Sequence, residues 1–211
     1  KISGLRWIRI LYCYPEEITD ELIQVIKEEP KICHYLDLPI QHASDGILKR
    51  MGRRTSKAQL IETIEKLRRE IPDIALRTTL ITGFPGETQE QHEELMDFVD
   101  QMEFDRLGVF TYSPEEDTPA ASMPDQIPEE VKEDRQAELM ELQQDIVFDQ
   151  AEDRIGEELL VMIEGKVADE NAYVGRTYRD APNVDGLIFV NTSEELMSGD
   201  FARVKVTGSA D

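Results

Sequence analysis

Hydrophobic positions in the first half of the chain alternate between two spacings. Short apolar runs rich in β-branched residues predict strands, and apolar residues repeated every three or four positions predict helices. The predicted strands are residues 7–12, 35–38, 75–82 and 107–112, and the helices between them are residues 19–28, 45–51, 56–70 and 89–102. Strands that alternate with helices pair in parallel through right-handed crossovers. We therefore expect an α/β fold of about four βα units, either an open layer or a partial (β/α) barrel.

The pattern changes in the second half. Residues 113–128 are irregular and rich in Pro and acids, and Pro128 suits the first position of a long helix that ends near Asp153. We expect its apolar stripe to be formed by Val131, Leu139, Leu142, Ile146 and Phe148.

After Gly156 the pattern is all-β. Strands are predicted at residues 158–167, 172–178, 187–190 and 201–206, with turn chemistry at Asp185-Gly186. Short strands with turns between them suggest a small five-stranded, OB-like barrel. The expected division is a first domain at residues 1–153 and a β-barrel domain at residues 154–211, whose closing strand we expect to be missing.

Charge narrows the choice of partners. The net charge is −22, and residues 115–153 carry 14 acids against 2 bases. Residues 156–211 carry 11 acids against 5 bases. Nucleic-acid binding draws most of its affinity from Lys and Arg, so a basic protein partner suits this surface better. No apolar run approaches the ~20 residues of a membrane span, and no signal peptide is evident, so we expect a soluble, cytoplasmic protein.

The most informative stretch is residues 77–88. A β-branched strand runs into a Gly-Phe-Pro-Gly turn, and a helical pattern opens at Thr88. Glycines let the backbone approach a ligand, and a helix start offers unpaired N–H groups. An ordinary βα connection with Pro fixing the turn is the alternative.

Two further polar clusters end neighbouring strands. Gln41, His42 and Ser44 follow the second predicted strand, and Tyr112 to Ala120 follow the fourth. Ligands of parallel α/β folds bind at the C-terminal ends of strands, so we expect the three clusters to surround one pocket. Gln41, Arg77 and Glu87 should then lie close together. A lone His is more often structural than catalytic, and no nucleophile elbow or paired-His metal motif is present in the sequence.

Taken together, several segments resemble the radical S-adenosylmethionine (SAM) methylthiotransferases, of the type that modifies an aspartate of ribosomal protein S12. The resemblance is carried by residues 6–9, 35–44, 49–54, 77–87 and 110–120, and residues from about 156 onward are similar to a TRAM domain.

The resemblance implies a partial (β/α) barrel that binds an iron–sulfur cluster and SAM at its top. Reduction of the sulfonium gives a 5′-deoxyadenosyl radical, and a methylthio group is installed at the β-carbon of aspartate. It also implies that the SAM end is lined by a set of nine residues, with Arg77 expected to pair with the SAM carboxylate. These are Gln41, His42, Ser44, Arg77, Gly83, Phe84, Pro85, Gly86 and Glu87.

The chain departs from this family in its cysteines. The family binds one 4Fe-4S cluster through Cys-x-x-x-Cys-x-x-Cys and a second cluster in an N-terminal domain, whereas this chain has only Cys13 and Cys33. These match no metal spacing and are expected to be reduced core thiols. We therefore expect a fragment that ligates no metal and is inactive alone, while the parent enzyme uses SAM and two clusters.

Two other functions stay open at this point. One is a tRNA methylthiotransferase of the same family, because TRAM domains of those relatives bind RNA. The other is a non-catalytic protein-binding module. Charge favours ribosomal protein S12, held through the acidic TRAM domain, over nucleic acid.

Overall fold

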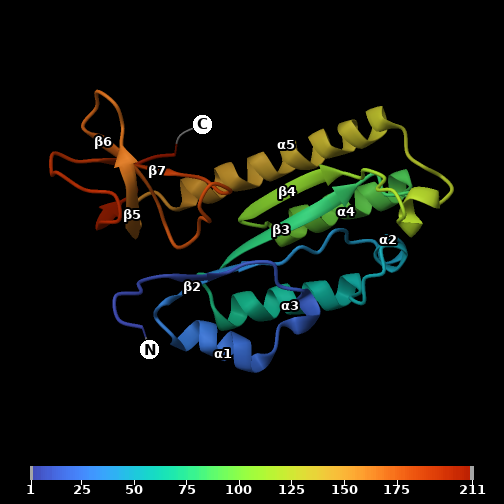
Figure 1. Ribbon diagram of the computed structural model, residues 1–211, viewed down its shortest axis with the longest axis horizontal. Helices are drawn as coiled ribbons and strands as arrows, with labels where there is room; N and C mark the ends of the chain where they lie inside the picture. Colours follow the sequence, from blue (N-terminus) through green and yellow to red (C-terminus); the bar gives the residue numbers. More distant parts are fainter. Residues whose placement is uncertain (1, 210–211) are drawn as a thin grey trace.

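A parallel sheet, a long helix and an antiparallel sheet follow one another along the chain (Figure 1). The structure is a computed structural model that describes residues 2–209. The parallel sheet has the order β1-β2-β3-β4, from β1 (Ile8–Ile10), β2 (Ile32–Asp37), β3 (Ala75–Thr82) and β4 (Arg106–Thr111). Its helices are α1 (Asp20–Glu28), α2 (Asp45–Arg50), α3 (Lys57–Glu70) and α4 (Gln89–Met102), with short 3-10 turns η1 (Pro15–Glu17) and η2 (Pro119–Ser122). All elements predicted for this half are confirmed, and β3 and α4 agree residue for residue.

Local sequence signals explain where the helices begin. Ser56 and Gln59 form a reciprocal capping box at the start of α3, and Thr88 and Gln91 do the same for α4. Thr19 caps α1 by accepting the Leu22 N–H at 3.2 Å. Each cap satisfies backbone donors that a helix start leaves unpaired, so the βα connections are fixed close to the sheet.

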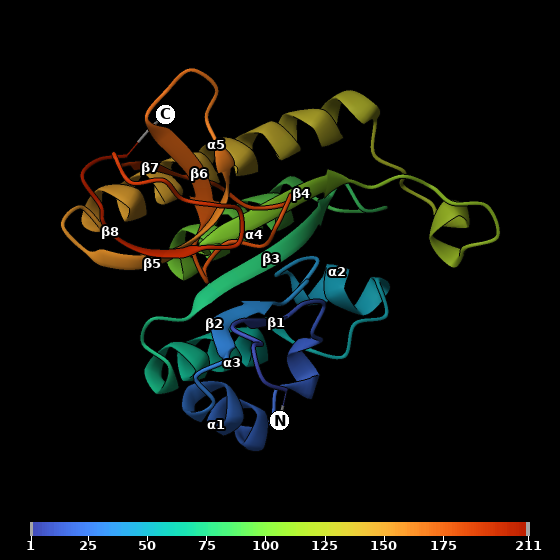
Figure 2. The ribbon, with the colours of Figure 1, turned by 60° about the vertical axis from the view of Figure 1, so that its left-hand side comes forward.

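The helices cover one face of the parallel sheet and leave the other to different contacts. Alternate residues of β3, among them Leu76 and Leu80, join apolar residues of α1, α3, α4 and α5 in one buried cluster. The intervening residues, such as Arg77 and Thr79, point to the opposite face because strand side chains alternate. We call this second, helix-free side the inner face. Figure 2 shows the helices on the outer side of the twisted sheet.

Helix α5 (Glu129–Asp153) packs on β4 and α4 through a face that differs from the predicted one. Its buried residues are Lys132, Arg135, Leu139, Gln143 and Ile146, whereas Phe148 is 41% exposed. Leu139 and Ile146 are buried and Leu142 packs half-buried on the same cluster, so these three confirm part of the predicted stripe. The polar members are buried because they meet main-chain carbonyls: Lys132 Nζ donates to Tyr112 O at 2.8 Å, and Gln143 Nε2 donates to Phe104 O at 2.7 Å. Helix α5 is therefore held on the sheet by hydrogen bonds as well as by apolar contacts.

The antiparallel sheet has the order β7-β6-β5-β8, from β5 (Glu158–Lys166), β6 (Ala172–Arg176), β7 (Ile188–Asn191) and β8 (Phe201–Lys205). Its concave side buries Val161, Ile163, Tyr173 and Val190. Within the described residues the sheet has the four strands predicted from the sequence, and it forms a half-barrel rather than a closed five-stranded barrel. No helix among residues 2–209 is both long and apolar enough to cross a membrane.

A loop between β6 and β7 joins the two sheets. Residues 177–185, which we call the docking loop, lie against the inner face and the N-terminal edge of the parallel sheet. Arg9 Nη2 donates to Tyr178 O at 2.8 Å, and the Tyr178 hydroxyl donates to Asp73 O at 2.8 Å. The ring of Trp7 also packs edge-on against Phe201 of β8, with centroids 4.9 Å apart. The antiparallel sheet is therefore docked on the parallel one.

Candidate functional site

Three polar loops meet at the C-terminal edge of the parallel sheet, as the sequence predicts. The loop after β2 is held to β3 by main-chain bonds, since Gln41 N donates to Thr79 O at 2.9 Å and Ile81 N donates to Gln41 O at 2.8 Å. On the other side of β3, Tyr112 N donates to Thr82 O at 2.9 Å. The segments that contain Gln41, Gly83 and Tyr112 are thereby placed side by side.

Glu87 is the centre of a buried polar cluster behind these loops. Its carboxylate accepts the Gly83 N–H at 2.9 Å and pairs with Arg135 Nη1 of α5 at 2.7 Å. His42 Nε2 lies 3.3 Å from Glu87 Oε2, and both side chains are fully buried. Burial by itself raises the pKa of this carboxyl, but His42, Arg135 and the Gly83 amide favour the charged form more strongly. The pKa of Glu87 therefore lies below its ordinary value.

The orientation of His42 follows from its neighbours. Ser44 N donates to His42 Nδ1 at 2.9 Å, so in the neutral ring the proton lies on Nε2, which faces Glu87. His42 is 0% exposed and Ser44 4%. These two predicted site residues, together with Glu87, brace the loops from behind.

The glycines of the Gly-Phe-Pro-Gly turn are required by the backbone and by space. Gly83 and Gly86 have φ of +70° and +77°, a region that L side chains rarely adopt. A Cβ at Gly83 would lie 2.2 Å from Lys132 Cγ, and one at Gly86 would lie 1.9 Å from Arg50 Nη1. Phe84 is buried between them and packs on Tyr112 with ring centroids 5.2 Å apart. The turn is thus a rigid, tightly packed loop.

Arg77 lies in a different place from Glu87. It is the third residue of β3 and points to the inner face, where Nη1 is 3.1 Å from Asp37 Oδ1 and Nε is 3.4 Å from Asp185 Oδ1. Glu87 instead faces α5 on the helix-covered side. Strand alternation places Arg77 on the inner face, whereas Glu87 follows β3 in a loop that turns it toward α5, so the two side chains contact different groups. That both line the SAM end stays a prediction of the family resemblance.

The sequence analysis missed the network around Arg77 because one of the two acidic partners of Arg77, Asp185, lies in the docking loop. Asp185 also accepts the Tyr35 hydroxyl at 2.8 Å. Burial, with this hydrogen bond next in importance, raises the pKa of Tyr35 far above its usual range. Nearby, Arg179 pairs with Asp105, and Arg106 pairs with Asp180. Each pair joins residues more than seventy positions apart, and no local pattern could reveal it.

One buried polar atom without a partner lies at the C-terminal edge. The Tyr112 hydroxyl has no hydrogen-bond partner among the described residues, so it is free to bind water or a ligand. Gln41, on the other side of β3, is half-buried and has a φ of +73°.

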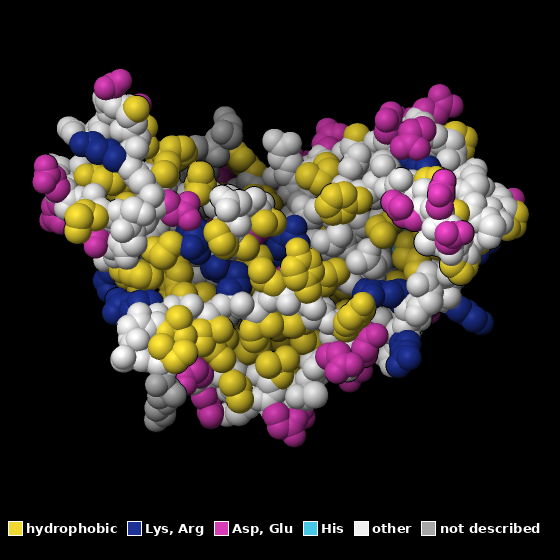
Figure 3. Space-filling model, in the orientation of Figure 1, with side chains coloured by type: hydrophobic (Ala, Val, Ile, Leu, Met, Phe, Trp, Pro, Cys, Tyr) yellow, Lys and Arg dark blue, Asp and Glu magenta, His cyan; other side chains and the backbone are white. Residues whose placement is uncertain are grey.

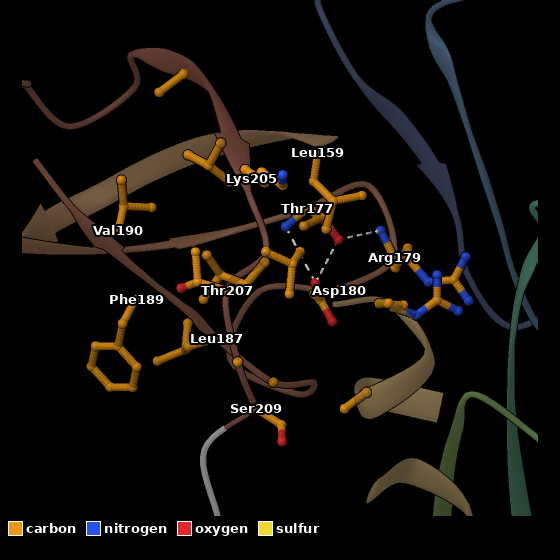
Figure 4. A pocket seen from close by; sticks show the side chains of 18 of the residues that line it. Leu159, Thr177, Arg179, Asp180, Leu187, Phe189, Val190, Lys205, Thr207 and Ser209 are labelled. Carbon is orange, nitrogen blue, oxygen red and sulfur yellow. Dashed lines mark hydrogen bonds between the residues drawn. The ribbon is translucent and has the colours of Figure 1, made fainter. Parts of the chain in front are cut away.

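A cavity lies elsewhere in the molecule. It has a volume of about 1100 Å³ and sits between the antiparallel sheet, the end of α5 and the start of β4 (Figure 4). Thr177, Arg179, Asp180 and Phe189 are among its lining residues. It lies at the N-terminal edge of the parallel sheet, away from the three loops.

The two cysteines occupy separate surroundings. Cys13 packs against the cluster on the helix-covered side, and Cys33 belongs to an inner-face cluster with Tyr35 and Ala181. Burial raises the pKa of both thiols, and the Asp37 charge adds to the effect at Cys13. Within residues 2–209 there is no group of three or more His, Cys, Asp or Glu side chains arranged to hold a metal ion.

Known proteins resemble both parts of the chain. The radical SAM superfamily matches residues 2–99, and the TRAM domain matches residues 155–211. The ribosomal protein uS12 methylthiotransferase RimO of Lachnoclostridium phytofermentans is 67% identical over 206 residues, which are 98% of this chain and 47% of that protein. The corresponding protein of Desulfitobacterium hafniense is 52% identical over 98% of this chain and 46% of its own length. The chain thus spans about half the length of these relatives.

A solved structure supports the fold. Coproporphyrinogen III oxidase (HemN) of Escherichia coli, described as a radical SAM enzyme, aligns with a TM-score of 0.50 at 20% identity and covers 72% of this chain and 34% of its own. Its similarity bears on the fold alone. With the matches to both domains and the identity of 52–67% over nearly all 211 residues, the chain carries a radical SAM domain followed by a TRAM domain and is similar to RimO proteins over nearly its full length.

Proposed function

We propose that the protein carrying these residues transfers a methylthio group to the β-carbon of an aspartate in ribosomal protein S12 by SAM radical chemistry. The observation that carries this proposal is the identity of 52–67% with RimO proteins over nearly the whole chain. The three loops at the C-terminal edge agree with it, because parallel α/β folds bind ligands there.

The residues at this edge are compatible with SAM. A polar nucleoside needs hydrogen-bond partners, and the unpaired Tyr112 hydroxyl and the half-buried Gln41 amide are available. We propose that Gln41, Phe84, Pro85 and the peptide groups of Gly83 and Gly86 line the SAM end. His42, Ser44 and Glu87 would hold these loops in position from behind. SAM, when bound, supplies the radical that activates an otherwise unreactive carbon.

The role of Arg77 stays a prediction of the family resemblance. Two aspartates already contact the Arg77 guanidinium, so a SAM carboxylate would have to bind the guanidinium alongside them. An Arg77→Lys variant of the full-length enzyme tests the role, because Lys keeps the charge and loses the planar fork. Unchanged SAM affinity would exclude it.

The residues present do not suit iron–sulfur ligation. Cys13 and Cys33 are the two cysteines of the sequence and lie on opposite sides of the sheet, so they cannot together ligate a cluster that is held by several cysteine thiolates. We propose that these 211 residues alone ligate no cluster and catalyse no transfer. Anaerobic reconstitution of the isolated chain that gave a stoichiometric coloured cluster would contradict this.

The proposed partner is the basic ribosomal protein S12, held through the acidic TRAM domain. The decisive experiment incubates the full-length, reconstituted protein with SAM, a reductant, a sulfur source and either an S12 peptide or tRNA. We expect 5′-deoxyadenosine and a methylthio group on the aspartate of the peptide by tandem mass spectrometry. Modification of tRNA with the peptide untouched would overturn the proposal.

A further inference from the structure

Four positive side chains gather beside the glycine loop of this acidic molecule. Lys49, Arg50, Arg53 and Arg54 end or follow α2, and we call them the basic rim. None of the four forms an ion pair with another described residue. In contrast, lysines of α1 and α3 pair with acids, as Lys27 does with Glu70 and Lys57 with Glu94. Figure 3 shows Lys and Arg side chains at the right-hand end of the molecule, beside the position of α2 in Figure 1.

The fold places the basic rim at the C-terminal edge of the parallel sheet. Helix α2 follows the loop after β2, and the Arg50 guanidinium lies against Gly86 in the loop after β3. Arg53 is already engaged, since it donates to Pro39 O and stacks over Tyr14 with 5.0 Å to the ring centroid. Arg50 is exposed and has no such partner among the described residues. It is therefore the available charge closest to the glycine loop.

We infer that Arg50, at the centre of the basic rim, receives a carboxylate of the polypeptide substrate. This inference rests on the proposed function, which brings a basic polypeptide to this edge. The net charge of −22 attracts a basic polypeptide to the molecule as a whole. Close to the basic rim, however, the Lys and Arg side chains of that polypeptide are repelled. An acidic residue is the part of a basic peptide that this spot favours, and guanidinium binds carboxylate through two parallel hydrogen bonds. The rim thus selects which residue of the peptide enters.

The test measures peptide binding by fluorescence anisotropy with the full-length protein. The two probes are the S12 peptide with its target Asp and the same peptide with Asn in that place. We expect the wild-type protein to bind the Asp peptide about tenfold more tightly, the effect of one strong charge-assisted pair. Arg50→Gln should remove this preference by weakening the Asp peptide alone. Arg69→Gln, at an exposed base of α3, is the matched control and should leave the preference intact.

A charge swap keeps the test decisive if Arg50 also supports the end of α2. Arg50→Glu should bind a peptide with Lys at the target position better than the Asp peptide. Equal losses for the Asp and Asn peptides in Arg50→Gln, or an unchanged preference, would overturn the inference. So would an anticodon-stem RNA that competes with the peptide and loses affinity equally in Arg50→Gln. A wild-type protein that shows the Arg50-dependent preference but never modifies the peptide would instead disprove the proposed function and leave the inference standing.

Discussion

Glu87 is enclosed by groups that stabilise its charge, and its own charge in turn compensates Arg135. Glu87→Gln leaves the buried guanidinium without a carboxylate, so we expect a loss of about 3–5 kcal/mol in unfolding free energy at neutral pH. Urea unfolding followed by circular dichroism measures it. Glu62→Gln, an exposed acid of α3, is the control and should change the unfolding free energy little.

The same residue gives a pH dependence with a definite sign. Because the folded-state pKa of Glu87 lies below its ordinary value of 4.5, its contribution is complete above that value and is lost as the pH falls below it. The difference in stability between wild type and Glu87→Gln should therefore narrow on acidification. A difference that stays constant from about pH 6 to pH 3 would show that the pKa of Glu87 is the same in the folded and unfolded states, and would contradict the prediction.

At the residue scale, the sequence predicts the loops of the candidate site more reliably than it predicts the individual side chains that contact a ligand. The glycine turn could be predicted because its chemistry is local. The burial of His42 and Glu87 could not, since it depends on Arg135 from a helix nearly fifty positions away. The sequence did contain one indication of this buried cluster. Lys132 and Arg135 are the only bases among residues 115–153, and both lie on the buried face of α5.

At the element scale, the docking loop connects two sheets that the sequence presents as separate units. Arg179 is 7% exposed, pairs with Asp105 and donates to Asp73 O at 3.0 Å. We expect the wild-type chain to unfold in one calorimetric transition. Arg179→Met leaves Asp105 without its closest cation, so the antiparallel sheet should separate first and give two transitions.

The control for this prediction is Arg203→Met on β8, an exposed base without a hydrogen bond among those described. Trp7, the single tryptophan, packs on Phe201 across the interface and reports undocking by its fluorescence. A single transition in Arg179→Met with unchanged Trp7 emission would contradict the assigned role of the loop.

Elements were predicted well where periodicity is strong, and their docking was not. Helices α3 and α4 combine capping boxes with regular apolar stripes, which local physics alone specifies. The docking loop has no regular pattern, and its contacts join distant positions. Asp185-Gly186 predicts a turn, but nothing in the sequence indicates that this turn packs against the parallel sheet.

At the scale of the whole molecule, the net charge of −22 should govern the encounter with the proposed basic partner. Association with S12 should slow about tenfold or more as salt rises from low to physiological levels, with little change in dissociation. Glu194→Lys with Glu195→Lys, on the exposed loop before β8, should slow association more than Glu62→Lys with Glu65→Lys on α3. Stopped-flow fluorescence measures both rates. Equal slowing by the two double variants would place the contact outside the TRAM domain.

The docking loop also limits how such proteins can be recombined. Its side-chain partners Asp105 and Arg106 lie at the start of β4, so a TRAM domain transplanted from a relative brings only half of each pair. A functional hybrid would need these two positions to match the transplanted loop.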